Sequence, residues 1–344
     1  MLISEFDFDL PPGLIAQNPL PDRDASRMMV VLRKEEKILH ARFMEFPAYL
    51  GEGEVLVLND AKVLPAKVWG RRGEASVEFL FIKEKGPGVW DVLCKPAKRV
   101  RAGDRIDFPG GLAAAVIEAD GEGRRVLEFA APGVLGHLKK MGFAPLPPYI
   151  KRRKEDAGAR PADLARYQTV FAAKEGAIAA PTAGLHFTPR VLDEIRRKGI
   201  RIAEVTLDVG PATFQPIRVE RLEDHRMLEE TYEISNRAAK EINRAKEEKR
   251  PVTAVGTTVV RTLESAVDAS CRVQRGRGAT SLFIRPGHEF KIVNRLLTNF
   301  HLPKSTLLAL VAAFAGRDLV LAAYREAVRE RYRFFSYGDC MLII

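Results

Sequence analysis

The spacing of apolar and polar positions predicts that one stretch of the chain consists of β-strands. Between residues 62 and 134, short runs that alternate apolar and polar side chains predict six strands, at 66–70, 76–83, 89–94, 105–108, 113–118 and 124–129. Turn segments such as Pro109-Gly110-Gly111 separate them. Six short strands at this spacing predict a small closed barrel, because closure removes the strand edges that invite aggregation.

The rest of the chain alternates strands and helices. Apolar runs predict strands at 28–32, 54–58, 176–180, 200–208, 252–255, 281–284 and 295–298, and helices at about 189–198, 236–248, 257–267, 305–315 and 318–331. Thr188 and Pro189 mark the start of the first helix and Gly199 marks its end. Since residues 1–61 alone would make a poor domain, we expect an α/β body formed by 1–61 and 149–344, with a small antiparallel β-barrel domain inserted at 62–148.

Composition narrows the class of protein. The 344 residues are 46% hydrophobic and 29% charged, as in soluble globular proteins. The longest apolar stretch, Leu307 to Ala315, is shorter than the roughly 20 residues that cross a membrane, and the first residues are acidic where a signal peptide is apolar. Three widely spaced cysteines form no CxxC pair, and His225 with Glu229 lacks further ligands. We therefore expect a cytoplasmic protein with no membrane, disulfide or metal site.

A net charge of +10, from 55 basic and 45 acidic residues, permits binding to a polyanion such as RNA without showing it. Two basic groups are candidate phosphate contacts, with a solvated surface as the alternative interpretation. They consist of Lys98, Arg99 and Arg101 in the predicted barrel, and Lys151, Arg152 and Arg153 after it.

Polar segments follow several predicted strands, at 180–188, 208–214, 256–264 and 298–305, and an aromatic segment at 332–339 precedes the end. Active sites of α/β proteins collect where strands end, although each segment also fits a purely structural turn, cap or packing role. The turn at Gly256 joins a strand to a helix and suits an anion. It is neither a Walker A loop nor a GxGxxG loop.

Read in order, these segments resemble the S-adenosylmethionine:tRNA ribosyltransferase-isomerases of queuosine biosynthesis. The resemblance extends over residues 5–342. Its motifs are Ala16-Gln-Asn-Pro19, Arg23-Asp24 with Ser26-Arg27, Leu58-Asn-Asp60, Pro145-Leu-Pro-Pro-Tyr149-Ile150, Tyr167-Gln-Thr-Val170, 179–187, 255–264, 298–305 and 332–339.

The resemblance implies an unusual reaction. The ribosyl part of S-adenosylmethionine is transferred to the aminomethyl group of 7-aminomethyl-7-deazaguanine at the wobble position of tRNA and isomerised. The product is epoxyqueuosine-tRNA, and adenine and methionine are released. S-adenosylmethionine is then a co-substrate and no cofactor or metal is implied. The family fold is similar to the division expected above, and we expect a monomer.

The resemblance also suggests roles for residues, all of which we expect around one cavity. A base must remove a proton next to the sulfonium, and the candidates are His186 and His301, with Asp208 and Asp339 as carboxylate alternatives. The predicted substrate-binding set consists of Gly256, Thr257, Thr258 and Arg261 for the methionine carboxylate, Phe335 and Tyr337 for stacking on a base, and Glu264, Thr213 and Asn299.

The chain departs from the family pattern at several positions. Asp208 and Leu228 stand where histidines are usual, Ala212 where glycine is usual, and Asn294 where aspartate is common. Two other functions stay open: a non-catalytic RNA-binding protein, and a methyltransferase that uses the same donor. Against the methyltransferase, no glycine-rich loop with a following acidic residue comes after the first strand.

Overall fold

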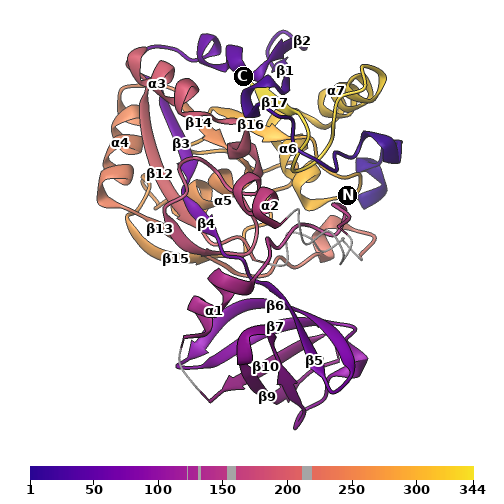
Figure 1. Cartoon of the computed structure of the whole chain (residues 1–344). Coiled ribbons are helices and arrows are strands. Elements are labelled where there is room, and N and C mark those ends of the chain that lie inside the picture. Colours follow the sequence, from indigo (N-terminus) through magenta and orange to yellow (C-terminus); the bar gives the residue numbers. More distant parts are fainter. Residues whose placement is uncertain (122, 131–132, 153–159, 211–218) are drawn as a thin grey trace.

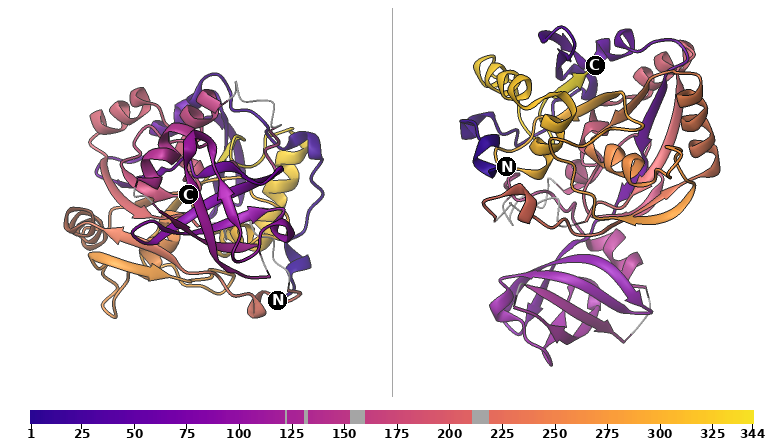
Figure 2. Two further views of the ribbon diagram at one scale, coloured as in Figure 1. Left: turned by 60° about the horizontal axis from the view of Figure 1, so that its bottom comes forward. Right: turned by 180° about the vertical axis from the view of Figure 1, so that it is seen from behind.

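The computed structural model describes residues 1–121, 123–130, 133–152, 160–210 and 219–344. They form an α/β body with a barrel attached to one end of it (Figures 1 and 2). The body contains a nine-stranded sheet in the order β15-β13-β12-β3-β14-β16-β17-β1-β2. Its strands are β1 (Arg27–Leu32), β2 (Lys37–Arg42), β3 (Val55–Asn59), β12 (Arg201–Leu207), β13 (Glu230–Ile234), β14 (Val252–Val255), β15 (Gly276–Thr280), β16 (Arg295–Asn299) and β17 (Cys340–Ile343).

Four central strands of this sheet are parallel. β12, β3, β14 and β16 pair side by side in the same direction, so their carboxyl ends meet at one edge. From β3 the chain continues through β4 (Ala61–Val63), which pairs with β11 (Lys174–Ala177), into the barrel. The carboxyl edge of the sheet is therefore the edge next to the barrel (Figure 1).

Helices cover both faces of the sheet. Strand β3 is buried throughout, with Val55 and Val57 in one core and Leu56 and Leu58 in the other, as the two-residue period of a strand requires. The first core contains α4 to α7 and the second contains α3. The helices are α1 (Val134–Met141), α2 (Arg160–Arg166), α3 (Pro189–Arg197), α4 (Asn236–Glu247), α5 (Thr257–Ser265), α6 (Thr306–Ala315) and α7 (Arg317–Arg329).

The predicted β-barrel is confirmed. Its six strands close in the order β10-β7-β6-β5-β8-β9, and all neighbours are antiparallel. A side chain at Gly70 would come within 2.8 Å of Ile106 and 2.9 Å of Phe108, so the barrel interior is closely packed there. The strands are β5 (Lys67–Arg72), β6 (Ala75–Gly86), β7 (Val89–Lys95), β8 (Arg105–Asp107), β9 (Ala113–Ala119) and β10 (Arg124–Phe129).

One predicted strand is wrong, and several elements were not predicted. The apolar run at 281–284 is not a strand, because β15 ends at Thr280, whose hydroxyl accepts the Leu282 N–H and turns the chain. The unpredicted elements are β2, β4, β13, β15, β17, α1 and α2. Within the described ranges, no single helix has the length and apolar character to cross a membrane. Among the described helices, only α6 and α7 taken together have that length and apolar character, and the chain bends by 116° between them.

Candidate active site

A cavity of about 360 Å³ lies at the carboxyl edge of the sheet. Its wall comes from the segment after β11, the β14–α5 turn, the β16–α6 connection and the turn at Phe335. A volume of this size suits a small molecule. The lining residues are Pro148, Tyr149, Tyr167, Ala179–Ala183, Val209, Gly256, Thr257, Thr258, Thr298, Asn299, His301–Leu307, Phe335 and Ser336.

The amino ends of two helices line this cavity. Gly256 caps α5 with φ +90°, a backbone conformation open to glycine, and the next residue begins the helix. Ser305 caps α6 by accepting the Leu308 N–H. The first backbone N–H groups of each helix have no carbonyl partner within the helix, and the helix dipole adds positive potential there. This end of the cavity therefore suits an anion.

His301 is the imidazole that reaches the cavity. It follows β16, and its Nε2 lies 2.9 Å from the Thr298 hydroxyl. Its backbone N–H donates to the hydroxyl of Tyr324, a residue of α7, at 2.9 Å. This hydrogen bond anchors His301 to that helix. Burial lowers the pKa of His301 to about 3, so the ring is neutral at neutral pH.

His186 lies behind the cavity wall and contacts it through Asn299. The Asn299 amide donates to His186 Nε2 at 3.4 Å, so the ring proton is on Nδ1, which is 3.0 Å from the Ser26 hydroxyl. Burial, together with the charges of Arg23 and Arg333, lowers the pKa of His186 to about 4. The neutral ring thus orients Asn299, whose Oδ1 also accepts the Thr182 hydroxyl at 2.8 Å.

Aromatic rings form another wall. Phe335, at φ +71°, lies 4.7 Å from the ring of Tyr149, and the Tyr149 hydroxyl is 2.6 Å from that of Ser336. Burial raises the pKa of Tyr149 to about 12, so this hydroxyl stays protonated. Tyr337 does not line the cavity. It packs edge to face on Tyr167 and borders the small space next to His186.

The two predicted carboxylates point elsewhere. Asp339 accepts the backbone N–H groups of Arg27 and Arg333 at 2.9 and 2.8 Å, so it joins two chain segments, and burial raises its pKa. Asp208 accepts the Thr231 hydroxyl at 3.1 Å, and burial raises its pKa as well. The next residue, Val209, is the one that lines the cavity.

Arg261 and Glu264, both on α5, also lie outside the cavity lining. The Arg261 guanidinium forms a buried ion pair with Glu230, which in turn accepts the Gly210 N–H at 3.0 Å. Glu264 accepts backbone N–H groups of the 291–293 segment at 2.9 to 3.1 Å. These contacts give both side chains structural partners in place of the predicted ligand.

The predicted RNA contacts are dispersed. Arg152 pairs with Asp163 through two hydrogen bonds of 3.0 Å, whereas Lys151 is exposed. Lys98 and Arg99 lie on a short helical turn of the barrel, and Arg101 is exposed just after it. Three predicted or noted positions, Thr213, Ala212 and Arg153, lie outside the described residues.

Sequence reasoning missed several lining residues. Tyr149, Tyr167, Thr182 and Ser336 all lie in motifs that carry the family resemblance, so the signal was present without a chemical role attached to it. Lys304 was not singled out because a lysine before a helix cap is unremarkable. Within the described part of the chain, no three His, Cys, Asp or Glu side chains are grouped to hold a metal ion.

Comparison with known proteins identifies the family. The model of the family described as "Queuosine biosynthesis protein" matches residues 3–343. The chain belongs to this family. Proteins named S-adenosylmethionine:tRNA ribosyltransferase-isomerase are similar to it over 100% of both chains, with 48% identity in Moorella thermoacetica and 46% in Halothermothrix orenii.

A solved structure agrees with this assignment. The crystal structure of S-adenosylmethionine tRNA ribosyltransferase from Thermotoga maritima is 38% identical to the chain and has a TM-score of 0.56. The similarity covers 99% of this chain and 100% of that one. This relative is therefore similar to the chain in fold as well as in sequence.

Proposed function

We propose that the chain transfers the ribosyl moiety of S-adenosylmethionine to 7-aminomethyl-7-deazaguanine at the wobble position of tRNA and isomerises it to epoxyqueuosine, releasing adenine and methionine. The observation that carries this proposal is the cavity at the carboxyl edge, which combines an anion-binding end, an aromatic wall and a neutral histidine. The similar proteins with the corresponding name support the same reaction.

Each part of the cavity has a task in this reaction. The amino ends of α5 and α6 bind the methionine carboxylate, since the first residues of both helices line the cavity. The Tyr149–Phe335 wall stacks on a flat base. His301 accepts the proton next to the sulfonium. Burial keeps the His301 ring neutral but makes it a weak base. The neighbouring sulfonium must therefore account for most of the acidity of the proton that is removed.

Product analysis tests the proposal. Incubation with S-adenosylmethionine and tRNA that carries the 7-aminomethyl base is expected to release adenine and methionine in equal amounts while the tRNA gains the ribosyl-derived group. Release of S-adenosylhomocysteine would instead identify a methyltransferase. Binding of tRNA with no released product would identify an RNA-binding protein without this activity.

A further inference from the structure

A second depression, of about 560 Å³, lies at the opposite edge of the sheet, where β14 begins. Seven cationic side chains line it, and Glu35 is the one acidic side chain among its lining residues. We call these seven the amino-edge cations: Arg33, Lys34, Lys246, Lys249, Arg250, Lys291 and Arg295.

Two of the amino-edge cations are neutralised within the protein. Arg295 pairs with Glu54 at 2.9 Å, and Arg250 pairs with Glu248 at 2.6 Å. For the other five, no ion pair with a carboxylate occurs within the described ranges. Their charge is therefore not neutralised by an ion pair within the described part of the chain, and an anion in the depression would be attracted by it.

Contacts with neighbouring groups hold two of the unpaired amino-edge cations, Arg33 and Lys246, in place. Its guanidinium donates to the carbonyls of Phe314 and Asn294 at 2.9 and 2.7 Å and lies 4.3 Å over the Phe314 ring. Lys246 likewise donates to the Cys271 carbonyl at 2.6 Å. Carbonyl and ring contacts orient these side chains but leave their charge available. Lys34, Lys249 and Lys291 are exposed around them.

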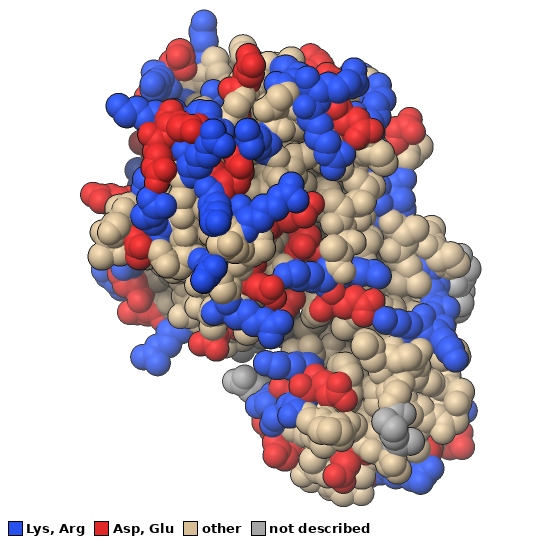
Figure 3. Space-filling model, turned by 90° about the vertical axis from the view of Figure 1, so that its left-hand side faces the viewer, with Lys and Arg blue, Asp and Glu red and all other residues tan. Residues whose placement is uncertain are grey.

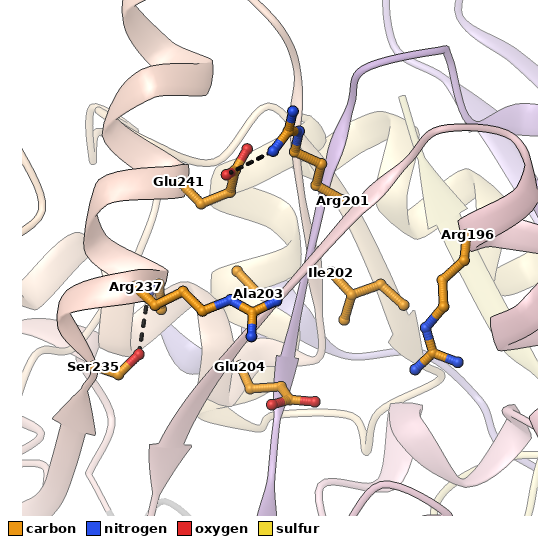
Figure 4. A pocket seen from close by; sticks show the side chains of 9 residues that line it. Arg196, Arg201, Ile202, Ala203, Glu204, Ser235, Arg237 and Glu241 are labelled. Carbon is orange, nitrogen blue, oxygen red and sulfur yellow. Dashed lines mark hydrogen bonds and ion pairs between the residues drawn. The ribbon is translucent and has the colours of Figure 1, made fainter.

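A neighbouring groove extends this basic surface along α4. It lies between α3 and α4 over the start of β12, and Arg196, Arg201 and Arg237 project into it (Figure 4). Glu241 links the two sites, because it pairs with Arg201 at 3.3 Å and with Arg250 at 3.8 Å. On this side of the molecule Lys and Arg gather over the upper body, with Asp and Glu between them (Figure 3).

We propose that the amino-edge cations bind backbone phosphates of the RNA substrate, at nucleotides remote from the one that enters the cavity. Cations spread over such a depression suit a chain of phosphates better than a single small anion. Pro251 lines the depression and Gly256 lines the cavity, so the sites lie at the two ends of β14, about 17 Å apart along the strand. The inference rests on the proposed function for the identity of the RNA.

The test compares two RNAs and two matched variants. The RNAs are full-length tRNA carrying the 7-aminomethyl base and its excised anticodon stem-loop. The variants are K34Q/K249Q and the control K85Q/K140Q, which removes two exposed lysines with no ion pair in the described structure, outside both sites and outside the groove along α4. Binding is measured by fluorescence anisotropy over a salt series, and adenine release is measured at saturating RNA.

In K34Q/K249Q we expect full-length tRNA to bind about five- to tenfold more weakly at about 0.1 M KCl, with a salt slope smaller by about 1 to 2. Stem-loop binding and adenine release at saturating RNA are expected to match the control. Equal salt slopes for both variants would overturn the inference, and so would an unchanged affinity of K34Q/K249Q for full-length tRNA. Absence of adenine release by the unmodified protein would refute the proposed function instead. The two failures can be told apart because tRNA binding and adenine release are measured separately.

Discussion

The side-chain amide of Asn299 lies 3.4 Å from Nε2 of His186 and joins this buried imidazole to the cavity. The same amide nitrogen lies 3.3 Å from the Phe335 carbonyl, so one asparagine is linked both to the histidine and to the turn that carries the aromatic wall. His186 is therefore a positioning residue, whereas His301 lines the cavity itself.

This difference predicts unequal effects of substituting the two histidines. His301→Gln is expected to lower the single-turnover rate about 10²- to 10⁴-fold, the range for loss of a base. His186→Asn is expected to lower it about tenfold, because Asn299 is less well oriented. The rate of His186→Asn should keep the pH dependence of the unmodified protein between about pH 6 and 8, since a group of pKa about 4 does not titrate there. Near-normal rates for His301→Gln would remove it from the chemistry.

The two buried histidines also predict how stability depends on pH. Their folded pKa values, about 4 and about 3, lie below the ordinary value of 6.5, so the unfolded chain binds more protons. Their stabilising contribution is complete above about pH 6.5. As the pH falls further, each contributes a loss of about 1.4 kcal/mol per pH unit until its folded pKa is reached.

Urea unfolding at about pH 6 and 5 measures this loss. His301→Asn should lose about 1.4 kcal/mol less than the unmodified protein over that unit of pH. An equal loss in both proteins would show that His301 is not buried as a neutral ring. Asp208 and Asp339, whose pKa values are raised, affect both proteins alike and cancel in the comparison.

The Glu230–Arg261 pair predicts a structural role for Arg261. Arg261→Met alone removes the guanidinium that pairs with the buried Glu230 carboxylate and is expected to cost about 3–5 kcal/mol of unfolding free energy. The double variant E230L/R261M should recover much of this loss and keep an unchanged KM for S-adenosylmethionine. If the folded double variant instead showed a KM raised tenfold or more, Arg261 would contribute to substrate binding after all.

The aromatic wall predicts a binding effect of Phe335. Phe335→Leu keeps an apolar side chain but removes the ring that faces Tyr149. Loss of stacking worth about 0.5–1.5 kcal/mol should raise the Kd for S-adenosylmethionine about two- to twelvefold in isothermal titration. Tyr337→Leu is the matched control, since Tyr337 lies outside the cavity lining and its replacement should leave that Kd unchanged.

Local patterns predicted the barrel but not every element of the body. The six barrel strands follow one another with a turn at each end, so their signals are local. Strand β17 was missed because its pairing is not local: Cys340–Ile343 lies between β16 and β1, and β1 is more than 300 residues away in sequence. Strand β2 is mostly exposed and lacks an apolar run.

The candidate site could likewise be predicted only in part, because some of its features follow from local patterns and others depend on non-local contacts. Gly256, Thr257, Thr258, Asn299 and His301 come together because parallel strands deliver their carboxyl ends to one edge, which a strand–helix alternation already implies. The placement of Arg261 and Asp339 could not be inferred from the motifs. It depends on partners such as Glu230 and the Arg333 backbone, which only the fold brings near.

The most direct test of the central claim is a crystal structure with S-adenosylmethionine bound. We expect the adenine against the Tyr149–Phe335 wall and the methionine carboxylate within hydrogen-bond distance of the Thr257 or Thr258 N–H. Density for the ligand at any other place on the molecule, with this cavity empty at a concentration that saturates turnover, would contradict the account.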